Sequence, residues 1–169
     1  MSKKSPWLIA VIVLLLTQKG AFAQAPVGNW VAADPSGSAI SAAIDNASHD
    51  FNFIVRPIAK KRLRAANPIP RTLSISQSGG SIEVVLNGSL RVRAKPGSTI
   101  TWPGPDNDPV KVTTSLEGDA LTQTFVADDG SKRNRYHLRS DGQLQLDVHV
   151  TSSKLKRPFD YTQLFRKQT

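Results

Sequence analysis

Residues 71–94 read RTLSISQSGGSIEVVLNGSLRVRA, and this stretch decides the fold class. Apolar and polar residues alternate along it with the period of two that is typical of half-buried strands. With Gly79-Gly80 as a two-residue turn, Ile75 faces Val84, and the apolar residues of both strands share one side. A slip of one residue would turn every side chain to the other face, so the stretch predicts an antiparallel hairpin in this register.

The following turns extend the same pattern. At Asn87-Gly88 the dipeptide favours a two-residue turn, whereas the apolar register, which sets Val84 opposite Val92, favours a three-residue loop. The segment 95–98, KPGS, predicts a type II turn with its glycine in the left-handed region.

Two later turns fix the remaining registers. Taking Asp129-Gly130 as a two-residue turn pairs Leu121 with Leu138 on an apolar face. Residues 140–142, SDG, fit a three-residue loop instead, which aligns Tyr136 with Leu146 and sets Arg135 opposite Asp147 on the other face. A two-residue loop there would place cationic and imidazole side chains among the leucines.

Short strands with short connections make an up-and-down meander, and closing a meander on itself removes its exposed edges. We therefore expect a mainly β fold, an antiparallel barrel or strongly curled sheet over about residues 71–166. The expected strands are 71–77, 81–86, 90–94, 98–102, 110–116, 120–127, 132–139, 143–151 and 159–166.

A helical segment is predicted before the meander, over about residues 35–66, and a short strand-like piece, 27–32, precedes it. Asp34 is a suitable N-cap, with Pro35 at the first helical position. Pro57 predicts a kink, or two helices that meet near Arg56. The apolar stripe keeps its phase across the proline, which favours one kinked amphipathic helix packed on the sheet. The stripe consists of Ile40, Ile44, Ala47, Phe51, Ile54 and Ile58.

The N-terminus has the pattern of a signal peptide over residues 1–23. Two lysines precede an apolar run over 7–16, which is too short to span a bilayer, and Ala21-Phe22-Ala23 provides small residues for cleavage. We expect a single exported domain, 24–169, in the periplasm or secreted. The chain has no cysteine, so disulfides and thiolate metal sites are excluded and apolar burial must stabilise the fold.

Gly28-Asn29-Trp30 lies just inside the expected mature N-terminus, a β meander follows it, and Arg166 stands at the end of the last expected strand. This arrangement resembles the Gly-x-Trp motif and the meander of the lipocalin family of the calycin superfamily. The resemblance implies that Trp30 closes one end of the barrel and that Arg166 packs across it. It also implies a non-enzymatic exported protein that encloses a small apolar or amphipathic ligand.

The apolar face of the meander supplies the candidate pocket wall, although the same residues would fill a dry core in a narrower barrel. Trp102, beside rigid prolines, fits either the gate of a pocket or a buried aromatic residue at a strand end. The candidate ligand-binding residues are Val92, Trp102, Phe125, Tyr136, Leu138 and Leu146.

The end of the helical segment carries the densest charge in a chain of net charge +9. Arg56, Lys60 and Arg64 follow one another at the i, i+4 spacing and share a helix face. They are either an anion-binding face or an ordinary solvated face. The alternative function is therefore an interaction or structural module that docks on anionic lipid or polysaccharide. Nucleic acid is a less probable partner, because no aromatic residues interleave with these cations.

Nothing in the sequence predicts an enzyme, a cofactor or a metal site. His137 and His149 fall on the outward face with Arg135 and Asp147, which favours a polar cross-strand ladder over an acid–base pair. The acidic residues of the 106–108 loop lack the glycine and distal glutamate of a calcium loop.

Overall fold

A computed structural model describes residues 24–104 and 107–168 of the chain. The predicted signal peptide, residues 1–23, lies outside the described residues, as does Asp106 of the acidic loop. In chain order the elements are β1 (Gly28–Ala32), α1 (Ser38–His49), α2 (Arg56–Ala66), β2 (Thr72–Ser78), β3 (Ser81–Leu86), β4 (Leu90–Ala94), β5 (Thr99–Pro103), β6 (Pro109–Glu117), β7 (Ala120–Ala127), β8 (Gly130–Leu138), β9 (Leu144–Ser152) and β10 (Phe159–Lys167).

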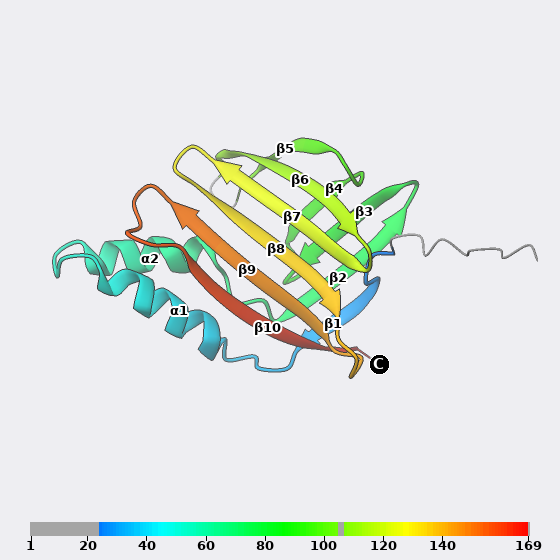
Figure 1. The fold of residues 1–169 in the computed structure, drawn as a ribbon, viewed down its shortest axis with the longest axis horizontal. Helices are drawn as coiled ribbons and strands as arrows, with labels where there is room; N and C mark the ends of the chain where they lie inside the picture. Colours follow the sequence, from blue (N-terminus) through cyan, green and yellow to red (C-terminus); the bar gives the residue numbers. More distant parts are fainter. Residues whose placement is uncertain (1–23, 105–106, 169) are drawn as a thin grey trace, which may run out of the picture.

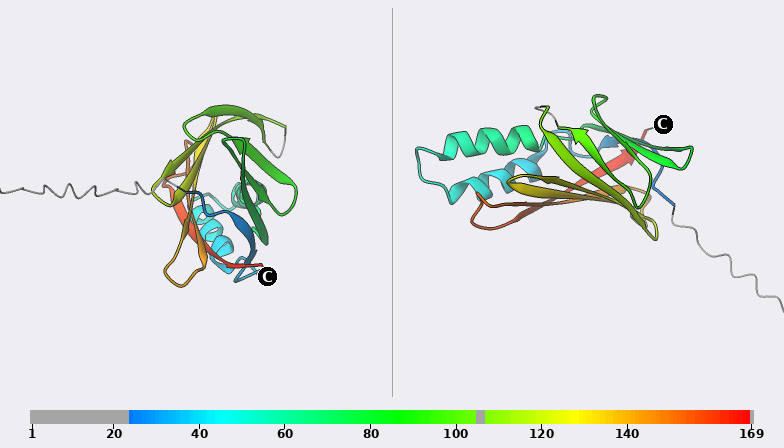
Figure 2. Two further views of the ribbon diagram at one scale, coloured as in Figure 1. Left: turned by 90° about the vertical axis from the view of Figure 1, so that its right-hand side faces the viewer. Right: turned by 90° about the horizontal axis from the view of Figure 1, so that it is seen from above.

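The strands form one antiparallel sheet that curls into a nearly closed barrel, with the two helices side by side at one end (Figures 1 and 2). The strand order is β4-β3-β2-β1-β10-β9-β8-β7-β6-β5, so the described strands leave one open seam, between β4 and β5. The predicted meander and barrel are confirmed.

Strand β1 completes the wall by joining the two ends of the meander. Trp30 of β1 lies opposite Leu73 of β2 on one side and opposite Lys167 of β10 on the other. Because β1 precedes the helices in sequence, the chain leaves the wall after one strand, forms the helical pair and then returns to build β2.

Three of the predicted turns are confirmed by the strand registers. Ile75 pairs with Val84, Val84 pairs with Val92, and Tyr136 pairs with Leu146. The loop at Asn87 therefore follows the apolar register rather than the dipeptide preference. In the predicted type II turn the backbone N–H of Ser98 donates to the carbonyl of Lys95 at 3.0 Å.

The predicted β7–β8 register was wrong by two residues. Leu121 pairs with Tyr136 rather than Leu138, and Ala127 pairs with Gly130, so the turn residues are the two aspartates before the glycine. Gly130 serves close packing rather than the turn, because a Cβ there would collide with the backbone carbonyl of Thr151. A shift of two residues preserves the face of every side chain, and the predicted inward and outward sets survive.

Of the two alternatives predicted at Pro57, the favoured single kinked helix was wrong, and the structure has two helices, the second of which begins at Arg56. Asn52 between them accepts backbone N–H groups from Ile54 and Val55 through its Oδ1, which provides hydrogen-bond partners at the start of a new helix. Pro57 lies in the first turn of α2, where its missing N–H costs nothing. The proline therefore begins a helix rather than bending one.

The N-terminal cap is close to the prediction but displaced along the chain. The Asp34 carboxylate accepts from the backbone N–H groups of Ser36, at 2.9 Å, and Ser38, at 3.2 Å. The helix itself begins at Ser38, after Gly37, which is left-handed with φ 65°. Pro35 thus belongs to the capping turn and not to the helix.

Candidate ligand pocket

A pocket of about 430 Å³ opens between α2 and the barrel wall. Val55, Ile58 and Leu63 line it from the helical side, while strands β3 to β9 supply the rest of the wall. The helices cover this end of the barrel, as Figure 2 shows. The interior is therefore neither wholly filled nor wholly hollow: a cavity lies at the end that the helices cover.

The predicted inward residues divide between the cavity and the packed core. Val92, Phe125 and Tyr136 line the pocket, together with Val84 and Leu86. The other predicted inward residues except Leu138 are buried in the hydrophobic cluster; these are Leu73, Ile75, Leu121, Leu144, Leu146 and Val148.

Two predicted ligand-binding residues do not line the pocket. Leu146 is 3% exposed and packs in the filled part of the barrel. Leu138 has the inward parity but is the last residue of β8, and its side chain is 43% exposed. Alternation along a strand gives the face of a residue, whereas the depth at which the interior is hollow depends on packing between distant strands.

Trp102 lines the pocket at the open seam. Its indole Nε1 donates to the backbone carbonyl of Arg91 at 2.7 Å, which links β5 to β4 where the strands themselves do not pair. Its ring packs edge-on against Phe125, with centroids 5.9 Å apart. The half-buried tryptophan thus acts as a side-chain bridge across the seam and as part of the pocket wall.

Polar side chains enter the pocket from β7 and β8, and sequence analysis did not single them out. Gln123, Lys132 and Asn134 all line the cavity with Tyr136. The alternation that sets Arg133, Arg135 and His137 outward requires Lys132 and Asn134 to face inward, so the signal was present in the register. Burial raises the pKa of the Tyr136 hydroxyl to about 12, which keeps it a neutral hydrogen-bonding group.

Hydrogen bonds through Asn67 fix the end of α2 to the barrel. The Tyr161 hydroxyl of β10 donates to Oδ1 of Asn67 at 3.3 Å, and Nδ2 of Asn67 donates to the carbonyl of Leu63 at 2.9 Å. Burial is the main cause that raises the pKa of Tyr161 well above its usual range. These bonds hold the helical side of the pocket against the wall.

The Gly-x-Trp element has a physical basis here, but the predicted arginine contact does not form. Trp30 is 3% exposed, and a Cβ at Gly28 would lie 3.2 Å from its Nε1, so the glycine leaves room for the indole. Arg166 lies opposite Val31 and is exposed. Residues one apart on a strand face opposite sides, and Arg166 therefore points away from the buried indole.

The predicted anion-binding trio is largely occupied by contacts within the protein. The Arg56 guanidinium donates to the carbonyls of His49 and Phe51, at 3.0 and 3.1 Å, and so closes the loop between the helices. Lys60 and Arg64 approach Asp45 of α1 at 2.6 and 3.7 Å. The hydrogen bond from Lys60 lowers the pKa of Asp45.

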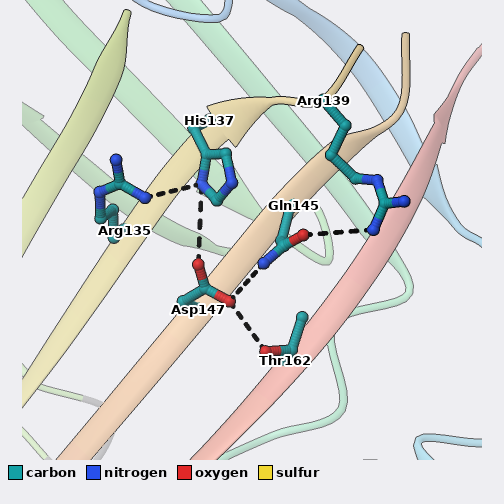
Figure 3. A network of polar contacts seen from close by, with 6 residues as sticks. All are labelled: Arg135, His137, Arg139, Gln145, Asp147 and Thr162. Atoms are coloured by element: carbon teal, nitrogen blue, oxygen red, sulfur yellow. Dashed lines mark hydrogen bonds and ion pairs between the residues drawn. The ribbon is translucent and has the colours of Figure 1, made fainter. Parts of the chain in front are cut away.

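The polar ladder predicted for the outer face is present (Figure 3). His137 lies between Arg135, at 3.1 Å, and Asp147, at 3.7 Å, while Asp147 also accepts from Gln145 and Thr162, each at 2.8 Å. His149 contacts Asp160 at 2.6 Å rather than Asp147. Both histidines lie on the far side of the wall from the pocket.

The described residues contain no helix that is long and apolar enough to cross a membrane. Within the same ranges, no three histidine or acidic side chains gather in a way that would hold a metal ion.

Solved structures share this architecture. The fatty acid transporter REP1-NXSQ matches with a TM-score of 0.54 and 14% identity, over 85% of this chain and 96% of its own. A mutant of that transporter gives 0.52 and 16%, over 84% and 97%. Human cRBP IV gives 0.51 and 18%, over 85% and 98%. The chain folds as a lipocalin-like β-barrel. No protein-family model and no curated protein sequence matches the chain.

Proposed function

We propose that the lipocalin-like barrel is a non-enzymatic binding protein that encloses a small apolar or amphipathic ligand. The observation that carries the proposal is the cavity of about 430 Å³ beneath α2, walled mainly by apolar side chains with polar groups among them. A fatty acid transporter and human cRBP IV have the same fold, which supports a lipid-like ligand. The amides, the phenol and the amine on β7 and β8 suit hydrogen bonding to a ligand. The hydroxyls of Ser131 and Thr151 also line the cavity but bond to each other at 2.8 Å, and Asp129 is paired with Lys154, so neither hydroxyl has a base beside it in the described residues.

A pocket-filling substitution tests this proposal. Val92 lines the cavity, so Val92→Phe is expected to weaken binding of a fluorescent fatty-acid analogue at least about tenfold, through lost space. Val85 precedes Leu86 on β3 and faces the other side of the wall, so Val85→Phe is the matched control. Native mass spectrometry of protein purified from its host should show a co-purified small molecule. Unchanged affinity in the Val92 variant would contradict a ligand in this cavity.

We also propose that the protein works after export, with a mature chain that begins at Gln24. The sequence pattern over residues 1–23 supports this, and an intact-mass measurement on protein recovered from the periplasm or medium tests it. A mass that corresponds to the full chain in that fraction would contradict cleavage after Ala23.

A second candidate function, docking on an anionic membrane surface, is favoured by the loop between the helices. Phe53 and Ile54 are 81% and 67% exposed, although large apolar residues are usually covered. Lys61 and Arg62, on the exposed surface of the adjoining α2, have no acidic partner within 4.0 Å among the described residues. Exposed apolar side chains in a loop, with cations on the helix that follows it, are complementary to an interface of acyl chains and anionic headgroups.

Vesicle binding separates this second function from a merely solvated loop. The protein should co-sediment with phosphatidylglycerol vesicles and not with phosphatidylcholine vesicles, and a Phe53→Ser/Ile54→Ser variant should lose most of that binding. Val126 of β7 is 46% exposed and far from the loop in sequence, so Val126→Ser is the control. Equal binding by both variants, or binding unaffected by salt, would reject docking through this loop.

A further inference from the structure

The strongest unexplained feature of the pocket is a pair of buried amide groups. Gln123 of β7 is 1% exposed, and its Nε2 has no hydrogen-bond partner among the described residues. Asn134 lies directly opposite on β8, and its buried Oδ1 also has none. Its Nδ2 is already engaged with the Tyr136 hydroxyl, at 3.2 Å. One free donor and one free acceptor thus face the same cavity from neighbouring strands.

A donor and an acceptor left unpaired in an apolar interior are costly, and proteins rarely leave them so without a partner. Directly opposite residues on paired strands have Cβ atoms about 5 Å apart, so one small group lies within reach of both side chains. A hydroxyl group suits this place, because it accepts from Nε2 and donates to Oδ1 at the same time. A carbonyl or a carboxylate would satisfy the Gln123 donor alone.

Lys132 adds a positive charge to the same wall. It lies two residues from Asn134 on β8, about 7 Å along the strand and on the same face. Its Nζ donates to the carbonyl of Ala66 at the end of α2, at 3.0 Å, and lies 5.5 Å from the centroid of the Phe125 ring. Lys132 forms no ion pair within 4.0 Å in the described part of the chain, and Asp129, a carboxylate that also lines the cavity, is paired with Lys154.

The state of this amine is consistent with a ligand that brings a negative charge. Burial lowers the pKa of Lys132 to about 8, so the ammonium form still predominates at neutral pH. The contacts that it makes are a neutral carbonyl and an aromatic ring, which solvate a cation without cancelling its charge.

The facing wall offers no polar groups in return. It consists of Val84, Leu86, Leu90 and Val92 from β3 and β4. The β3–β4 side of the cavity is therefore apolar, whereas Gln123, Lys132 and Asn134 extend along the β7–β8 side. Further polar residues line the cavity from α2 and β9, among them Arg62 and Thr151. A ligand with a single polar head would leave either Lys132 or the amide pair unmatched.

We propose that the cavity binds an amphipathic carboxylic acid that carries a hydroxyl group on its chain, with the carboxylate on Lys132 and the hydroxyl between Gln123 and Asn134. This inference rests on the proposed ligand-binding function and names the ligand class. The remaining aliphatic chain lies against the apolar wall of β3 and β4. Lys132, near the helix end, sets the carboxylate toward α2 and the hydroxyl farther along β8.

Binding of hexadecanoate, a mid-chain hydroxyhexadecanoate and hexadecanol, measured by displacement of a fluorescent probe, tests the proposal. The wild-type protein should bind the hydroxy acid at least about tenfold more tightly than the plain acid, because an unmatched buried pair then gains both bonds. Gln123→Leu should reduce this preference to near onefold while affinity for the plain acid is kept. Lys132→Met should weaken both acids about tenfold and leave the alcohol unchanged.

Lys111→Met, at an exposed position on β6, is the matched control and should change none of these affinities. Thermal unfolding checks that each variant folds, and Gln123→Leu is expected to keep or gain stability because it removes an unpaired buried donor. Equal affinity of the wild-type protein for the plain and hydroxy acids would overturn this inference and leave the carrier function standing. Failure to bind any of the three compounds would overturn both.

Discussion

Helices α1 and α2 come from one apolar pattern in the sequence and have opposite relations to the barrel. In α1 the stripe residues Ile40 and Ile44 are each 1% exposed and belong to the core. In α2 no residue is buried, and Ile58 of the same stripe is 56% exposed at the pocket mouth. The first helix thus supports the fold, whereas the second forms a loosely packed cover over the cavity. Helical periodicity therefore identifies an amphipathic face but not the partner of that face.

The largest expected effect comes from truncating one apolar stripe residue in each helix and comparing the two losses of stability. Ile44→Ala should lower the free energy of unfolding by about 3 kcal/mol, because it leaves a cavity in the core. Ile58→Ala should change it by less than about 0.5 kcal/mol, because the side chain is largely in solvent. Denaturant unfolding of both variants measures the difference. Equal losses would show that α2 is packed as tightly as α1 and would remove the distinction.

A smaller effect is expected at the start of α1, where Gly37 is left-handed and tightly packed. A Cβ there would lie 2.7 Å from the Ile69 side chain, in the segment that follows α2. Gly37→Ala should cost about 2 kcal/mol, from backbone strain and the contact together. Gly118 is also left-handed but has nothing within 4 Å, so Gly118→Ala measures the strain alone, about 1 kcal/mol. Equal costs at both sites would mean that α1 is not held by that contact.

The smallest expected effect concerns the acid sensitivity of the α1 cap. Hydrogen bonds from Ser36 and Ser38 lower the pKa of Asp34 from 3.8 to about 2. A lowered carboxyl pKa stabilises the folded state above the unfolded value, and this contribution is lost as pH falls from about 4 to about 2. Amide exchange at Ser36 and Ser38 should therefore accelerate over this interval. Asp34→Ala should show fast exchange throughout. The start of α2 should show no such step, because the side chain that accepts there is the amide of Asn52, which does not titrate.

The sequence predicted most of the wall because strand pairing leaves strong local marks. Turn residues and alternation together gave the register of the hairpins around Gly80 and Gly142, which the structure confirms. The β7–β8 register was predicted wrongly because Gly130 follows the turn instead of forming it. A glycine is required there because a side chain would collide with the backbone carbonyl of Thr151, a residue far along the chain. The sequence does not distinguish a glycine in a turn from a glycine required by close packing, because the neighbouring residue that requires it is known only from the tertiary structure.

The candidate site was predicted in part for the same reason. Val92, Phe125 and Tyr136 were placed on the inner face by alternation, and they line the cavity. Lys132 and Gln123 have the same parity, but they are polar, and the pattern that predicted the inner face consists of apolar residues. The family resemblance predicted Arg166 as the residue that packs on Trp30. Arg166 instead lies opposite Val31, so its side chain is on the other face of the wall from Trp30.

The amino-acid sequence by itself determined the antiparallel meander, the presence of a helical segment and the inward or outward face of nearly every strand residue, since these follow from nearest neighbours and a fixed period. Tertiary structure decided where β1 inserts, how the helical segment divides, and which part of the interior stays open. Those outcomes depend on contacts between residues far apart in the chain, such as Trp30 with Leu73 and Lys132 with Ala66. The volume of a cavity depends on the packing of all the elements that line it, so the sequence of one strand does not predict it.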